Sequence, residues 1–122
     1  MIEHFDTLET RDPEVRERAQ AAALPARIAL AKGRTAAYAK ILADIDPASI
    51  TSRAALAQLP VIRKSDLLDL QKAARPFGGF ATGGWGKSPR VFASPGPIYE
   101  PDGAERDYWR LARALFAARP CL

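Results

Sequence analysis

Apolar residues recur at helical spacing through much of the first part of the chain. Asp12 followed by Pro13 is a typical helix start, because the aspartate caps the first turn and proline fixes a helical φ. Good helix formers follow as far as Pro25, where the helix is expected to end or restart. Thr35 is placed to cap a second piece, in which Tyr38 occupies a position suited to core or groove packing.

A second helical block follows a short turn. Thr51 or Ser52 can cap a single short helix, which Pro60 closes because the residue before a proline is biased away from helix. Ser65 is then placed to cap a longer helix with two aspartates early in it, where the helix dipole favours negative charge. We therefore predict that residues 1–75 form a helical N-terminal segment.

The pattern changes after residue 75. Residues 76–89 contain five of the eight glycines together with two phenylalanines, Trp85 and two prolines. Such a composition predicts loops or a short hairpin whose aromatic rings need cover. The glycine spacing fits neither the dinucleotide-binding fingerprint nor the P-loop, so the segment carries no phosphate-binding signature. We expect a mobile connection whose aromatic side chains are available to a partner.

Residues 90–103 begin with a β-like signal. Arg90–Ala93 suits a short, partly buried strand, and the prolines and glycines from Ser94 onward stop it. A helix is expected from about Ala104 to Ala118. Five residues at spacings of three and four would form its apolar face: Tyr108, Leu111, Ala112, Leu115 and Phe116. The predicted fold class is mostly α with a short β segment, in which residues 76–103 form a Gly/Pro-rich loop and 104–122 a final amphipathic helix and terminus.

The order of strand, turn-rich loop and helix has two interpretations. Many proteins use it to hold a phosphate at a helix N-terminus. It is also a very common connection without any ligand, and the architecture alone favours that plainer interpretation.

Composition and charge restrict the class of protein. The 122 residues are 48% hydrophobic and 26% charged, which is typical of a globular domain and not of a disordered one. No run of about 18 apolar residues predicts a membrane span. The N-terminus is acidic and lacks the apolar stretch of a signal peptide, so we do not expect a signal peptide. We expect a cytoplasmic location. The net charge of +4 comes mainly from scattered arginines rather than a cluster, which argues against nucleic-acid binding.

Few side chains suggest catalysis. Cys121 is the single cysteine and His4 the single histidine, and neither has a neighbour in sequence that would make a metal site or a nucleophile with its base. We predict no catalytic residue and no metal site.

Four segments of the chain carry a family resemblance. HFDTLETRDPEVRER opens the chain, ALPARIALAKGRTAAYAKIL and LPVIRKSDLLDLQKAARPFGG follow, and DYWRLARALFAA lies near its end. In this order and at these distances they resemble the N-terminal portion of phenylacetate-CoA ligases, a branch of the AMP-dependent synthetase (adenylate-forming) superfamily. The resemblance implies the N-terminal part of an α/β large domain. It also places Lys64 in a family signature without giving it a catalytic role.

The same resemblance places a phosphate loop at residues 93–101. In the family this loop contacts ATP and is a run of serines, threonines and glycines ending in Gly-Lys-Pro. Aligned without gaps, the chain keeps Ser94, Gly96 and Pro101 in matching positions. Five other positions depart from the pattern: Pro95, Pro97 and Ile98 replace hydroxyl residues, Tyr99 replaces a glycine and Glu100 replaces the lysine.

These departures predict a degenerate loop that does not hold a triphosphate in the family manner. Exchanging a lysine for Glu100 turns attraction into repulsion, on the order of a few kcal/mol in a partly dry site. Each lost hydroxyl or N–H would cost roughly 1–3 kcal/mol if its partner stayed buried. We therefore expect no cofactor for the isolated chain, whereas an intact relative would use ATP, Mg²⁺ and coenzyme A.

Two functions follow from these observations. In the first, the chain is the N-terminal section of a phenylacetate-CoA ligase-like acyl-CoA or aryl-CoA synthetase, inactive alone because most of the active site lies elsewhere in such enzymes. In the second, it is a non-catalytic helical module that binds a protein partner, or a subunit of a split enzyme. Self-association, or binding of the missing remainder of the ligase, is the expected form of partnership.

Overall fold

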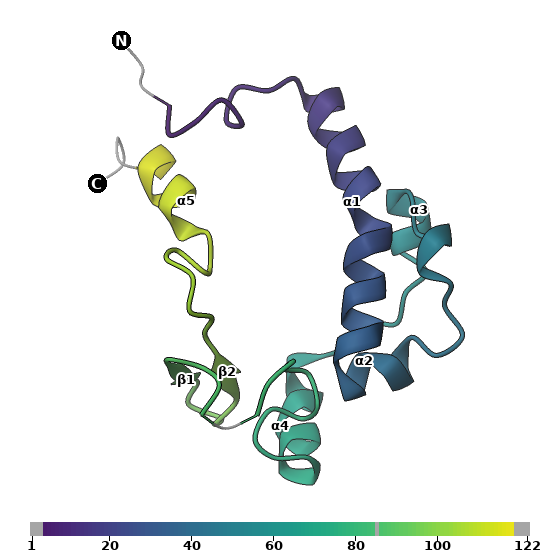
Figure 1. Ribbon diagram of the computed structural model, residues 1–122, viewed down its shortest axis with the longest axis vertical. Helices are drawn as coiled ribbons and strands as arrows, with labels where there is room; N and C mark the ends of the chain where they lie inside the picture. The colour runs from purple at the N-terminus through teal and green to yellow at the C-terminus, as the bar shows by residue number, and fades with distance from the viewer. Residues whose placement is uncertain (1–3, 85, 119–122) are drawn as a thin grey trace.

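The computed structural model describes residues 4–84 and 86–118. The elements, in chain order, are α1 (Pro13–Arg34), α2 (Ala36–Ile41), the 3₁₀ turn η1 (Pro47–Ser49), α3 (Arg53–Leu56), α4 (Lys64–Ala73), β1 (Val91–Ala93), β2 (Tyr99–Pro101) and α5 (Leu111–Ala118). Figure 1 shows the long helix α1 on one side and α5 on the other, with α4 and the hairpin between them at one end. The mostly helical class with a short β segment is confirmed.

Helix α1 starts as the sequence predicts and continues further. The Asp12 carboxylate accepts hydrogen bonds from the N–H groups of Glu14 and Val15, at 2.8 and 3.2 Å. The expectation that Pro25 ends or restarts the helix is wrong, since α1 runs unbroken to Arg34. Proline removes one N–H from the helical ladder, but its fixed φ is itself helical, so a long helix can contain it.

The predicted caps of the short helices are partly correct. The Thr35 hydroxyl accepts from the Tyr38 N–H, and Ser52 accepts from the N–H of Ala55, as a cap should. Ser65 is not a cap, because α4 begins one residue earlier, at Lys64, and Arg63 occupies the cap position without a side-chain hydrogen bond.

The glycine-rich loop after α4 finds its cover inside the chain. Phe77 is buried, and the ring of Phe80 packs edge-on against Tyr38 with centroids 5.4 Å apart. The carbonyl of Gly79 accepts a hydrogen bond from the N–H of Ala37, which ties the loop to α2. These two phenylalanines are therefore not free for a partner, while Trp85 lies outside the described residues.

The segment around the expected strand is an antiparallel hairpin. β1 pairs with β2 in the register Val91 with Pro101, Phe92 with Glu100 and Ala93 with Tyr99. The second strand was not expected, and β1 is exposed along its length rather than partly buried. Pro101 is accommodated because its position does not donate a hydrogen bond to β1, so its missing N–H costs no ladder bond.

Helix α5 is shorter than predicted. It begins at Leu111 instead of near Ala104, because Asp107 and Arg110 have φ values of 56° and 54° that an α-helix cannot contain. Residues 104–109 form bends and turns instead. Tyr108 therefore precedes the helix and does not belong to its apolar face, and Cys121 lies outside the described residues.

The N-terminal arm joins the two ends of the described chain. Figure 1 shows it running from α1 towards α5. The Phe5 ring meets Phe116 edge-on at 5.8 Å, and the Arg113 guanidinium binds the carboxylate of Asp6. Local sequence patterns cannot predict such contacts, because the paired residues lie more than 100 positions apart.

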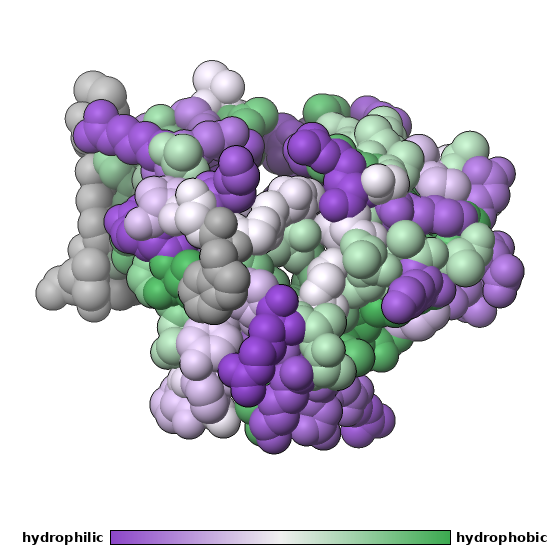
Figure 2. All heavy atoms as spheres, turned by 60° about the horizontal axis from the view of Figure 1, so that its bottom comes forward, coloured by the Kyte–Doolittle hydropathy of each residue, from purple (hydrophilic) through white to green (hydrophobic). Residues whose placement is uncertain are grey.

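The core is small. Only Leu42, Ile50, Phe77 and Ile98 are buried apolar residues among those described. Figure 2 shows polar and apolar side chains interspersed on the face that carries α4 and the hairpin. Within residues 4–84 and 86–118, no helix combines the length and apolar character needed to cross a bilayer.

Candidate functional site

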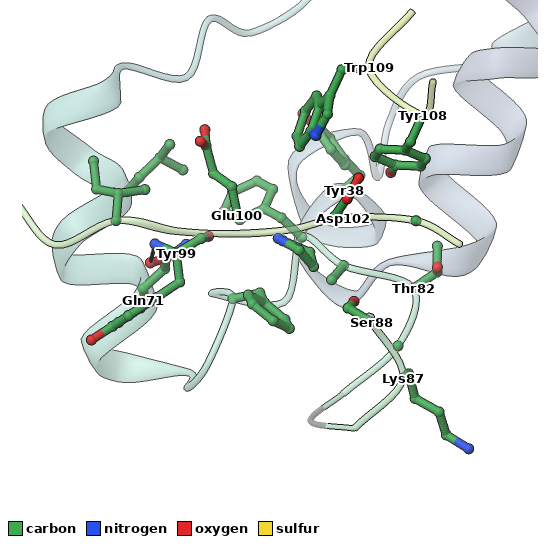
Figure 3. A pocket seen from close by; sticks show the side chains of 18 of the residues that line it. Tyr38, Gln71, Thr82, Lys87, Ser88, Tyr99, Glu100, Asp102, Tyr108 and Trp109 are labelled. Carbon is green, nitrogen blue, oxygen red and sulfur yellow. Dashed lines mark hydrogen bonds between the residues drawn. The ribbon is translucent and has the colours of Figure 1, made fainter. Parts of the chain in front are cut away.

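A cleft of about 610 Å³ opens where α2, α4, the glycine-rich loop, β2 and the segment 103–109 meet. Tyr38, Gln71, Thr82, Tyr99 and Asp102 are among the residues that line it (Figure 3). Apart from α4, each of these elements is irregular or very short. The cleft therefore depends on a few specific contacts that fix the hairpin against the helices.

The first of these contacts joins α4 to β2. The Gln71 side-chain amide donates to the carbonyl of Tyr99 at 2.8 Å, and its oxygen accepts from the Tyr99 N–H at 2.8 Å. Gln71 is only 7% exposed. Its side chain thus behaves like one residue of a neighbouring strand and satisfies the outer edge of β2.

The second contact is an ion pair at the base of the hairpin. The Arg90 guanidinium binds Oδ2 of Asp102 through Nε at 2.7 Å and through its terminal nitrogen at 2.6 Å. The Asp102 side chain is completely buried, whereas that of Arg90 is largely exposed. Oδ1 of Asp102 is buried without a hydrogen bond from any described residue. A carboxylate in this position needs Arg90, because burying an unpaired charge is costly.

Aromatic rings form the opposite rim of the cleft. Tyr108 and Trp109 meet edge-on with centroids 5.2 Å apart, and Trp109 also contacts Phe92 at 6.4 Å. Gly103 allows the Tyr108 ring to lie directly against the backbone, since a Cβ there would come within 2.2 Å of Tyr108 Cδ2. Figure 3 shows Tyr108 and Trp109 side by side above the segment of chain that carries Asp102.

The three residues predicted for the degenerate phosphate loop all lie in the hairpin, but only one reaches the cleft. Pro101 ends β2 and lines the cleft with Tyr99 and Glu100. Ser94 and Gly96 lie at the turn and do not line it. The Ser94 hydroxyl accepts a hydrogen bond from the Ile98 N–H at 3.2 Å and so closes the turn.

The helix that follows the loop has no free N-terminus. Oδ1 of Asp107 accepts from the N–H groups of Leu111 and Ala112, at 2.8 and 3.1 Å. A carboxylate thus occupies the place where a phosphate would bind. The proposed geometry of strand, loop and adjoining helix N-terminus is therefore not the one that this segment adopts.

The charged side chains that line the cleft are those of Lys87, Glu100 and Asp102. In the part of the chain that the structure describes, no three His, Cys, Asp or Glu side chains are grouped to hold a metal ion. His4 lies at the N-terminal arm beside Glu9, away from the cleft-lining residues. Lys87 lines the cleft but its side chain extends away from it in Figure 3. The arrangement can hold a ligand by shape, stacking and hydrogen bonding.

Sequence patterns missed the two polar residues that organise the cleft. Gln71 looks like an ordinary polar position on a helix, and nothing local distinguishes it from exposed glutamines. Asp102, between Pro101 and Gly103, has the signature of a turn residue. Tyr38 was correctly expected to pack, and it both contacts Phe80 and lines the cleft.

Comparison with known proteins gives one informative match. No protein-family model matches the sequence, and no curated protein matches it either. Among solved structures the chain is similar to a 2-hydroxyisobutyryl-CoA ligase, determined in its postadenylation state in complex with 2-HIB-AMP, with a TM-score of 0.76 at 23% identity. The match covers 90% of this chain and 25% of that chain. The chain therefore has the fold of part of an acyl-CoA ligase and spans about a quarter of its length.

Proposed function

We propose that the chain is the N-terminal section of a phenylacetate-CoA ligase-like acyl-CoA or aryl-CoA ligase and that it does not activate a carboxylate alone. An intact relative would form an acyl adenylate from ATP with Mg²⁺ and then transfer the acyl group to coenzyme A. The observation that carries the proposal is the match in fold of 90% of the chain to one quarter of a ligase. Four sequence segments that resemble phenylacetate-CoA ligases support the narrower family, and a cytoplasmic location would accompany it.

The geometry of the hairpin supports the absence of activity in the isolated chain. The hydroxyl of Ser94 is engaged within the turn, and Glu100 brings a negative charge to the cleft. The α5 N–H groups are already bonded to Asp107. A triphosphate would meet repulsion and few free donors at this hairpin.

Calorimetric titration with ATP and Mg²⁺ tests this part of the proposal. The native chain is compared with a Tyr99→Gly, Glu100→Lys double variant, which restores the residues that the family resemblance implies. The variant keeps both hydrogen bonds between Gln71 and residue 99, because Gln71 bonds to the backbone of Tyr99 rather than to its side chain. We expect no binding by the native chain. Binding by the native chain, or formation of acyl adenylate from it, would overturn the proposed inactivity.

A second function is favoured by the surface of α5. Leu111 and Leu115 are 55% and 62% exposed, so its apolar face is largely uncovered. A protein-interaction module, or one subunit of a split ligase, would present such a face to a partner.

Sequencing the gene on both sides of this segment separates the two functions. A coding sequence for the rest of a ligase supports the ligase section if it continues the same reading frame, and the split enzyme if it is a separate gene. Its absence would overturn the ligase section and leave the interaction module.

A further inference from the structure

The hairpin has one closed edge and one open edge. Because the Asp102 N–H bonds to the Arg90 carbonyl and the Ser94 N–H to the Ile98 carbonyl, the residues between them alternate in direction. Tyr99 therefore points its N–H and carbonyl away from β1, where Gln71 binds both. By the same alternation, Val91 and Ala93 point theirs away from β2, and no other described segment bonds to them.

The open edge is apolar and exposed. Val91 is 38% exposed and Phe92 47%, and Trp109, which contacts Phe92, is 48% exposed. No charged residue lies within β1, and the one at its start, Arg90, is bound to Asp102. Natural proteins usually protect such an edge with charge, proline or another segment.

We propose that β1 pairs with β1 of a second copy of this chain and forms a continuous four-stranded sheet. A two-fold axis at Phe92 would place Val91 opposite Ala93 of the second copy, and the reverse, so that all four outward N–H groups and all four carbonyls are bonded. Arg90 would face Ser94 of the second copy, so no like charges oppose each other.

Two further features favour a second copy over an unrelated strand. The two Phe92 rings would lie directly opposite each other on one face of the sheet, each beside the Trp109 of its own chain. This arrangement would cover the exposed aromatic cluster of Phe92 and Trp109. The outer edges of the resulting sheet are both β2, and each is already closed by Gln71. The assembly therefore ends at a dimer. Pairing would also stabilise the hairpin, because a sheet of only two three-residue strands is marginally stable.

The pairing is independent of the proposed function, since it requires only this chain. Sedimentation equilibrium over a range of concentrations measures it, with hydrogen exchange of the Val91 and Ala93 amides as a local readout. We expect a dimer in which both amides become protected as the concentration rises. Ala93→Pro removes an outward N–H but no bond of the hairpin, and should raise the dissociation constant about tenfold or more. The matched variant Ala93→Ser keeps the N–H and should leave the constant nearly unchanged.

Two additional variants keep the test decisive. Phe92→Asp places two carboxylates opposite each other at the two-fold axis without changing the backbone, and should also separate the dimer. Protection of the Asp102 amide from exchange shows that the hairpin remains folded. Leu115→Glu on α5 should leave the dimer intact. A dimer lost only in Leu115→Glu would assign the interface to α5 and overturn the proposal. A chain that stays monomeric at concentrations on the order of 1 mM would also overturn it and leave the edge to a strand of a longer polypeptide.

Discussion

The side chain of Gln71 and the backbone of Tyr99 bond to each other twice, each time at 2.8 Å. This pair is the direct hydrogen-bonded link between α4 and the hairpin. It fixes β2 against α4, two walls of the cleft. The Gln71 side chain makes the two backbone hydrogen bonds that a neighbouring strand would otherwise make. The stability of the hairpin should accordingly depend on Gln71 far more than its sequence context indicates.

Gln71→Ala should lower the free energy of unfolding by about 2 kcal/mol, because both Tyr99 groups lose their partner while partly buried. Urea denaturation followed by circular dichroism measures this. Gln71→Glu should cost at least as much, since a carboxylate oxygen would face the Tyr99 carbonyl. Gln58→Ala, at an exposed glutamine, is the matched control and should change little. Equal effects of the Gln71 and Gln58 variants would refute a role for the pair.

Arg90→Ala should destabilise the chain by about 1–3 kcal/mol, because it leaves the buried Asp102 carboxylate without its cation. The range is reduced from that of a fully buried pair because Arg90 is largely exposed to solvent. Arg90→Lys should restore only part of the loss, since a single ammonium cannot reproduce the two guanidinium contacts. Arg34→Ala, an exposed arginine, serves as the control in the same denaturation experiment. A variant as stable as the native chain would show that the pair contributes nothing.

Two glycines should respond to alanine in opposite directions. Gly33 lies within α1, and a Cβ there would have open space, so Gly33→Ala should stabilise the chain by up to about 1 kcal/mol through helix propensity. Gly79 has a φ of +79°, and a Cβ would come within 3.2 Å of the Ala37 nitrogen. Gly79→Ala should therefore destabilise by about 1–2 kcal/mol. Thermal unfolding of both variants measures the difference, and the same sign for both would contradict this placement of the loop.

The contact between the N-terminal arm and α5 should weaken in acid. The hydrogen bond from Arg113 holds the pKa of Asp6 below its usual value of 3.8. Since the folded-state pKa lies below the unfolded one, the stabilisation is present at neutral pH and is lost as the pH falls through the lowered pKa. NMR titration should show the Phe5 and Phe116 signals shifting in that strongly acid range. In Asp6→Asn this transition should be absent; its persistence would assign it to another group.

The same contact should also be sensitive to salt. Asp6 and Arg113 are both partly exposed, so added salt should weaken their attraction in the native chain. The Asp6→Asn variant should show no such dependence in the same NMR signals.

Local sequence patterns predicted those features whose cause is local. Asp12 with Pro13, Thr35 and Ser52 cap helices through bonds to residues two or three positions away, so the caps could be identified without knowledge of the fold. The strand predicted over Arg90–Ala93 contains the observed strand β1, because the preference of these residues for extended backbone is also local. The likeness to an acyl-CoA ligase also came from the residues and is matched by the fold.

Only the tertiary structure determined how the last third of the chain is arranged. The return of the chain as β2 depends on Gln71, which is distant in sequence, and on Pro101 falling where no ladder donor is needed. The late start of α5 depends on the positive φ values of Asp107 and Arg110, which no local propensity demands. Sequence thus determined where the capped helices α1, α2 and α3 begin, because caps act within a turn. The cleft and the open edge of β1 arise instead from contacts between segments far apart along the chain.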